Sequence, residues 1–225
     1  MDTCNGIKTQ FRSTGHNKQD RQYAMIGEQF VSKCIDSKIL KEPWPHQIIE
    51  DTLPQQEFVK LKDQCLNIDV PKDRLVHIFP KDFADHNITF YDQIHNISKM
   101  ILDNAKVLCD QYPNHRWFDD LAVNCHISVT PPLPYKFYIH MEGLEKIWSS
   151  VTYITPEINV GTKMYTNQDE KAFVKEAEWK PNNTFIFCGQ QNKTWHSYES
   201  DQTQQRITLN LFLVNGRSKI ITFRN

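Results

Sequence analysis

The chain has 225 residues, with 27 acidic and 26 basic side chains and a net charge of −1. This length suits one domain, and 39% hydrophobic with 12% aromatic residues are enough for a packed core. The near-neutral charge argues against nucleic-acid partners, and the lack of a segment with ~20 apolar residues argues against a membrane-bound protein.

Residues 1–25 are polar, and we interpret them as a flexible N-terminal arm. They contain no hydrophobic core of a secretory signal, so we expect a cytoplasmic location. The cysteines are spread evenly without a C-x-x-C pair, which predicts reduced thiols that pack inside the protein. They are Cys4, Cys34, Cys65, Cys109, Cys125 and Cys188.

The next part of the chain, 26–118, has the pattern of a helical support region. A short strand is predicted near 47–50. The run Asp51-Thr52-Leu53-Pro54 then resembles a helix start, with an Asx-type cap and a proline in the first turn, so we expect a helix to about Leu66. Apolar residues at three-and-four spacing predict a second helix between Tyr91 and Tyr112.

From Leu121 onward the pattern changes to short β segments separated by proline, glycine and asparagine turns. We expect strands near 121–129, 134–141, 147–155, 161–166, 172–179, 184–189, 206–214 and 218–224. Short strands after a helical N-terminal part predict a mainly β protein with supporting N-terminal helices (α+β), built on a double-stranded β-helix, or jelly-roll barrel. The predicted domain is 26–225, with the jelly-roll core over 119–225.

The candidate functional residues form a His-x-Glu…His…Arg array. Residues two apart on a strand share a face, so Tyr138, His140 and Glu142 are expected to point into one barrel mouth. His196 follows 54 positions after Glu142, and Arg206 ten positions after that. Two imidazoles and a carboxylate are the ligands of non-heme iron(II) oxygenases, and an arginine could hold an anionic co-substrate.

These motifs give the chain a resemblance to the iron(II)- and 2-oxoglutarate-dependent dioxygenases of the prolyl-4-hydroxylase-like type, common in marine bacteria and their phages. The matching elements, which span roughly 40–215, are PWPHQIIEDTLP (43–54), His140-x-Glu142, VTYI (151–154), GTKMY (161–165), Trp195-His196 and Arg206-Ile207-Thr208. A phage or viral origin would place the protein in the cytoplasm of the infected host.

The resemblance implies that His140, Glu142 and His196 are both metal ligands and catalytic residues that hold Fe(II). The co-substrates would be 2-oxoglutarate and O2. Arg206 would bind the distal carboxylate of 2-oxoglutarate, with Thr208 and Tyr153 as hydroxyl donors. The implied reaction is hydroxylation of an unactivated carbon in a peptide or small molecule, with a peptidyl proline as the default substrate.

Glu142 stands where this family usually has aspartate, so catalysis depends on how this longer side chain is placed. One alternative is a non-catalytic jelly-roll binding or structural module with a degenerate metal site. A cupin-like metalloenzyme without 2-oxoglutarate is a third hypothesis, against which Arg206 argues. Substrate choice is expected to depend on mouth loops near 67–90, 129–136 and 166–172, where no motif identifies the substrate or an oligomeric state.

Overall fold

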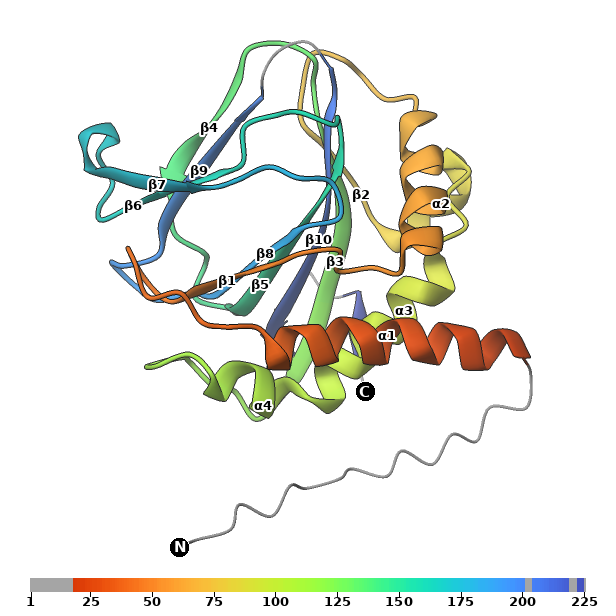
Figure 1. The fold of residues 1–225 in the computed structure, drawn as a ribbon, viewed down its shortest axis with the longest axis horizontal. Coiled ribbons are helices and arrows are strands. Elements are labelled where there is room, and N and C mark those ends of the chain that lie inside the picture. Colours follow the sequence, from red (N-terminus) through yellow and green to blue (C-terminus); the bar gives the residue numbers. More distant parts are fainter. Residues whose placement is uncertain (1–17, 201–203, 219–221, 225) are drawn as a thin grey trace, which may run out of the picture.

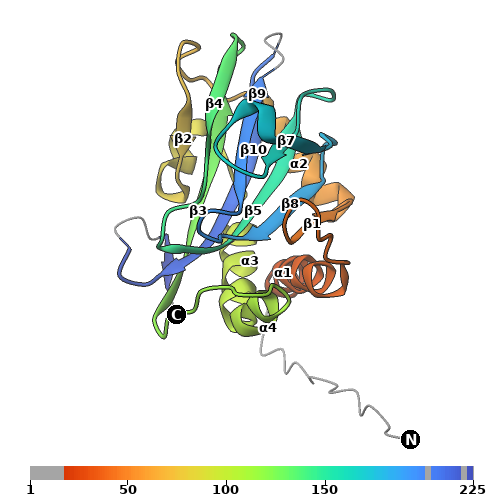
Figure 2. The ribbon, with the colours of Figure 1, turned by 90° about the vertical axis from the view of Figure 1, so that its left-hand side faces the viewer.

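The structure is a computed structural model that describes residues 18–200, 204–218 and 222–224. In this part of the chain, two antiparallel sheets face each other (Figures 1 and 2). The large sheet has the order β1-β8-β5-β10-β3-β11, with β2 also paired to β3; the small sheet has the order β4-β9-β6-β7. Two facing antiparallel sheets are the architecture of a jelly-roll barrel, and the predicted fold class is confirmed.

The strands of the large sheet are β1 (His46–Ile49), β2 (Val76–Ile78), β3 (Leu121–Thr130), β5 (Lys146–Thr155), β8 (Thr184–Cys188), β10 (Arg206–Asn215) and β11 (Phe223–Arg224). Those of the small sheet are β4 (Tyr135–His140), β6 (Thr162–Tyr165), β7 (Phe173–Ala177) and β9 (Trp195–Ser200). The helices are α1 (Lys18–Asp36), α2 (Gln55–Leu66), α3 (Tyr91–Asp103) and α4 (Ala105–Asp110), with short 3-10 turns η1 (Pro80–His86) and η2 (Glu170–Ala172).

The α-helices cover the face of the large sheet that points away from the small sheet (Figure 1). α1 and α3 pack against each other, and α3 contacts β3 and β10. The two helices come close together at Gly27, where an added Cβ would lie 2.8 Å from the carbonyl oxygen of Asn96. A larger residue at Gly27 would therefore push the two helices apart.

The start of α1 differs from the expected N-terminal arm over 1–25. The helix begins at Lys18, so the last part of that segment is helical, while residues 1–17 lie outside the described part of the chain. Downstream of the arm, Ile26, Phe30 and Cys34 from this helix are buried in the main core.

The two faces of strand β10 point to different environments on either side of the large sheet. Ile207, Leu209, Leu211 and Leu213 belong to the core shared with the helices, whereas Arg206, Thr208, Asn210 and Phe212 line a pocket between the sheets. This alternation is the one that the sequence predicted, and it follows from the period of two along a strand.

The helices and strands predicted from the sequence agree with the structure in most places, but two strands were not predicted. Every predicted strand has a counterpart, although residues 219–221 of the last one lie outside the described residues. The predicted helix over 91–112 is divided into α3 and α4 at Asn104. Strands β2 and β9 were not predicted. β2 lies inside the segment 67–90 that was expected to be a mouth loop, and it brings His77 into the pocket.

The cysteines with described positions are buried free thiols: Cys34, Cys65, Cys109, Cys125 and Cys188. This agrees with the expected packing role, and Cys4 lies outside the described residues. None of the helices in the described ranges combines the length and the hydropathy that crossing a bilayer requires.

Candidate metal centre and anion pocket

Two histidines and a glutamate meet at one end of the small sheet. His140 is the last residue of β4, and the antiparallel neighbour β9 places His196 directly opposite it. The two imidazole rings lie 4.2 Å apart between centroids. An oxygen (Oε1) of Glu142, two residues beyond β4, lies 3.9 Å from Nε2 of His196. One ligand atom from each residue lies within 4.8 Å of the other two, so the structure brings the predicted His-Glu-His triad together.

Tyr138 does not join this triad. The pairing of β4 with β9 shifts in register between Phe137 and His140. Tyr138 stacks on Phe137, with ring centroids 4.7 Å apart, and 64% of its side chain is exposed. The strict alternation expected over 138–142 is therefore interrupted by this irregularity, and Glu142 reaches the site from the connection that follows β4.

The tautomers of both histidines suit a metal. Nδ1 of His140 lies 3.0 Å from the carbonyl oxygen of Tyr138, and Nδ1 of His196 lies 2.9 Å from that of Thr194. A carbonyl oxygen only accepts, so each Nδ1 is assigned the proton and each Nε2 a free lone pair. Metal-binding histidines are typically oriented in this way by a second hydrogen bond. The residues present therefore fit an iron(II) ion.

The protonation states also favour a bound cation. Burial and the neighbouring His140 lower the pKa of His196 to about 4, and burial lowers the pKa of His140 as well. Burial alone would raise the pKa of Glu142, but Lys146 and the two imidazoles outweigh it, so this pKa lies below its ordinary value. At neutral pH the site has two neutral imidazoles and one carboxylate, the forms that bind a metal.

Lys146, the first residue of β5, holds the glutamate in place. Its Nζ lies 2.7 Å from Oε2 of Glu142 and 3.9 Å from the centroid of the Phe212 ring. The hydroxyl of Ser149 donates to Oε1 of Glu142 at 3.4 Å. One carboxylate oxygen is thus occupied by the ammonium group while the other faces His196. Sequence reasoning missed Lys146, because a spacing of four identifies neighbours on a helix and not across a strand connection.

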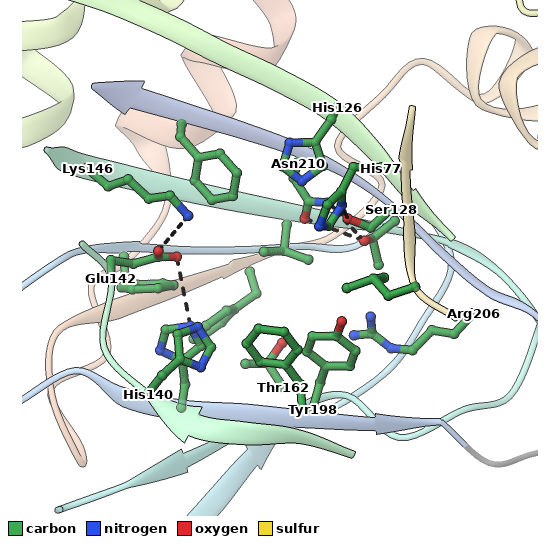
Figure 3. Close-up of a pocket in the computed structure, with 18 residues that line it drawn as sticks. His77, His126, Ser128, His140, Glu142, Lys146, Thr162, Tyr198, Arg206 and Asn210 are labelled. Atoms are coloured by element: carbon green, nitrogen blue, oxygen red, sulfur yellow. Dashed lines mark hydrogen bonds and ion pairs between the residues drawn. The ribbon is translucent and has the colours of Figure 1, made fainter. Parts of the chain in front are cut away.

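A pocket extends from the triad between the inner faces of the sheets (Figure 3). Its volume is about 170 Å³, similar to a cavity of ~150 Å³ that holds benzene in another protein. Arg206 lies at another end of this pocket, and only 2% of its side chain is exposed. Its guanidinium carbon lies 4.4 Å from the ring centroid of Tyr198 and 4.8 Å from that of Trp179.

Arg206 is a buried cation without a carboxylate partner within ion-pair distance among the described residues. Its Nε is buried and makes no hydrogen bond in this part of the chain. Burial lowers the pKa of Arg206, although Tyr198, Tyr153 and Glu176 oppose this, and a guanidinium remains charged. Buried charges are normally paired, so this arginine is suited to an anion that enters the pocket.

The two predicted hydroxyl donors occupy different positions. Thr208 lines the pocket beside Arg206. Tyr153 lies next to the guanidinium, 5.8 Å from ring centroid to guanidinium carbon, but its hydroxyl donates to Thr162 at 3.0 Å. Thr162 and Tyr198 face the pocket and were not predicted. The signal for Tyr198 was its position two residues after His196, which puts both side chains on one face of a strand.

No protein-family model matches the sequence, and no curated protein sequence matches it. Solved structures do match. A prolyl hydroxylase from Trichoplax adhaerens, in complex with a peptide fragment of the hypoxia inducible factor oxygen degradation domain, is 13% identical with a TM-score of 0.55, covering 90% of this chain and 94% of its own.

A viral collagen prolyl hydroxylase from Paramecium bursaria Chlorella virus-1 is 14% identical, with a TM-score of 0.52 and coverage of 80% of this chain and 95% of its own. At such identities the likeness concerns the fold. The protein has the fold of the prolyl-4-hydroxylase-like 2-oxoglutarate oxygenases, and its His-Glu-His cluster is a candidate metal site within that fold.

Proposed function

We propose that this protein is an iron(II)- and 2-oxoglutarate-dependent dioxygenase that hydroxylates an unactivated carbon, with a peptidyl proline as the first substrate to test. The observation that carries the proposal is a buried arginine, without an ion-pair partner among the described residues, in the same pocket as a His-Glu-His triad. A triad alone also fits other metalloenzymes. Arg206 adds an anion site that a cupin-like enzyme without 2-oxoglutarate does not need.

In this proposal His140, Glu142 and His196 hold the iron through the two Nε2 atoms and Oε1 of the carboxylate. When bound, iron(II) would supply the activation of dioxygen, so that one oxygen atom of O2 enters succinate, formed from 2-oxoglutarate with loss of CO2, and the other converts a C–H bond of the prime substrate to C–OH. Lys146 keeps Oε2 of Glu142 occupied, which directs Oε1 toward the metal position.

Arg206 would bind the distal carboxylate of 2-oxoglutarate by two parallel hydrogen bonds from its planar guanidinium. Tyr198 follows His196 by two residues, about 6–7 Å along the strand, and its ring contacts Arg206. A five-carbon dicarboxylate is long enough to bridge this separation. Thr162 would donate a hydroxyl hydrogen bond to the same carboxylate, and Tyr153 would hold Thr162 and Arg206 in place. Thr208 would donate to it in exchange for its 3.4 Å bond to Oδ1 of Asn210.

A non-catalytic module with a degenerate site is the competing function, and the glutamate in place of aspartate is what suggests it. Two observations favour a working site. The carboxylate is ionised and oriented by Lys146, and both histidines present a free Nε2.

Release of succinate from 2-oxoglutarate, with and without iron(II), tests the proposal. We expect slow release that requires iron and oxygen, and faster release when a proline-containing peptide is the correct prime substrate. His196→Ala should abolish release, whereas Arg206→Ala should raise the 2-oxoglutarate concentration required. Equal release by the wild type and both variants would contradict the proposal.

A further inference from the structure

A second polar cluster lies in the pocket, on a different wall from the triad and from Arg206 (Figure 3). It consists of His77 on β2, His126 and Ser128 on β3, and Asn210 on β10. The strand pairing places these side chains on one face, because His77 pairs with Ser128 and Asn210 pairs with His126. None of them has a role in binding iron or 2-oxoglutarate in the proposed function.

A chain of hydrogen bonds sets the tautomer of His77. The side-chain amide of Asn210 donates to Oγ of Ser128 at 2.8 Å, and this hydroxyl lies 2.9 Å from Nδ1 of His77. Within the described residues the hydroxyl proton has no acceptor other than Nδ1. Since buried polar hydrogens are almost always bonded, we assign the lone pair to Nδ1 and the proton to Nε2. His77 thus offers an N–H donor.

His126 has the opposite tautomer. Its Nδ1 lies 3.3 Å from Oδ1 of Asn124, and an amide oxygen only accepts, so Nδ1 carries the proton and Nε2 keeps its lone pair. The ring is held between those of Phe79 and Phe212, with centroids 5.5 and 5.6 Å away. His126 therefore offers a fixed acceptor, and its ring centroid lies 4.5 Å from that of His77.

Both rings are uncharged at neutral pH. Burial lowers the pKa of His77, and Lys146 lowers it further. Burial, His77 and Lys146 together lower the pKa of His126 well below its ordinary value. The donor and the acceptor are therefore both present under ordinary conditions.

We propose that His77 and His126, whose ring centroids lie 4.5 Å apart, form a subsite for an uncharged primary amide group of the prime substrate, in which C=O and one N–H lie on the same side of the C–N bond. Nε2–H of His77 donates to the amide oxygen, and Nε2 of His126 accepts from the amide N–H. A carboxylate would face the lone pair of His126, and an ammonium group could not accept from His77, so charged groups fit poorly. This amide subsite rests on the proposed oxygenase function in one respect only, because it takes this pocket as the place where the prime substrate binds.

The test uses nuclear magnetic resonance of the histidine rings in the full-length, 15N-labelled protein without added metal. Correlation spectra of the ring nitrogens distinguish the two neutral tautomers, and His77→Phe and His126→Phe assign the signals. We expect Nε2–H on His77 and Nδ1–H on His126. N-acetylglycinamide, an uncharged probe with two amides, is then titrated, with acetate and methylammonium as comparators.

The proposal predicts that N-acetylglycinamide shifts the Nε2 signals of both rings at a lower concentration and by a larger amount than either ion does. Each single variant should weaken binding of the probe by roughly threefold to tenfold, the loss of one hydrogen bond. His95→Phe, on the exposed face of α3, is the matched control and should change nothing. Two identical tautomers, charged rings, or correct tautomers that the probe leaves unmoved would each overturn the subsite.

These outcomes are independent of the proposed oxygenase function. Failure of the amide to bind leaves iron-dependent succinate release unaffected. Conversely, absence of succinate release would leave a positive amide titration intact.

Discussion

Replacing Arg206 with methionine separates a structural arginine from one that binds a co-substrate. Methionine has a similar length and removes only the charge and the hydrogen-bond donors. Because no carboxylate pairs with Arg206 in the described part of the chain, the substitution leaves no buried anion uncompensated. We therefore expect the free energy of unfolding to stay unchanged or to rise, since replacing buried ions with apolar side chains is often neutral or stabilising.

The effect on 2-oxoglutarate binding should be much larger. A bidentate contact consists of two charge-assisted hydrogen bonds, each contributing about 1.5–3 kcal/mol. Their sum of roughly 3–6 kcal/mol corresponds to a loss of about 10²- to 10⁴-fold in affinity, at about 1.4 kcal/mol per factor of ten. Arg206→Lys retains a charge but lacks the planar fork, so its affinity for 2-oxoglutarate should lie between those of the wild type and Arg206→Met.

The assay is calorimetric titration of 2-oxoglutarate into the Mn(II)-loaded protein, together with thermal unfolding of each variant without ligand. Arg217→Met is the matched control, because this arginine is exposed in the turn after β10. An affinity of Arg206→Met for 2-oxoglutarate within a few-fold of that of the wild type would show that Arg206 does not bind this co-substrate. An unfolded Arg206→Met, together with a folded Arg206→Lys that does not bind 2-oxoglutarate, would show that Arg206 has a structural role instead.

Three further predictions concern the triad and the core. Glu142→Gln should weaken binding of Mn(II) at least about tenfold, because an amide lacks the charge of the carboxylate ligand; titration monitored by electron paramagnetic resonance measures this, and unchanged affinity would remove Glu142 from the site. Lys146→Met leaves a buried carboxylate without its counter-charge and should lower the free energy of unfolding by about 1–3 kcal/mol. The loss should be smaller when Mn(II) is present. Denaturant titrations with and without Mn(II) test this, and an equal loss in both conditions would contradict it. His46 is buried, its Nε2 has no hydrogen-bond partner among the described residues, and burial, the largest influence, lowers its pKa. The unfolded chain therefore binds a proton more readily, so the free energy of unfolding falls as the pH drops below about 6.5. His46→Phe should flatten this decline, and identical slopes for the variant and the wild type would disprove the assignment.

The sequence was informative wherever a local pattern determined the structure. Alternation along β10 placed Arg206 and Thr208 on the pocket face and the leucines on the helix face, because the period of a strand is fixed. His140 and Glu142 also lie at one end of the barrel as expected, although Glu142 stands just beyond β4 and not on the strand face from which its place was predicted. Both positions depend on residues close together in the chain.

The missed features depend on contacts between distant segments. β9 has the sequence WHSYES, whose alternation is weak, and it is defined by pairing with β4 and β6. β2 is three residues long and is a strand because it pairs with β3. Tyr138 was expected in the mouth, but the irregularity in β4 arises from pairing with β9, which a pattern of period two does not encode. Lys146 and His77 reach the pocket through the same long-range arrangement.

In the proposed function this pocket couples dioxygen to 2-oxoglutarate. Supplying 18O2 to the iron(II)-loaded protein with 2-oxoglutarate, and analysing the succinate by mass spectrometry, measures this coupling. We expect succinate that contains one atom of 18O, formed by the wild type and not by His196→Ala. Absence of labelled succinate from an iron-loaded, folded wild-type protein would show that the pocket does not couple the two.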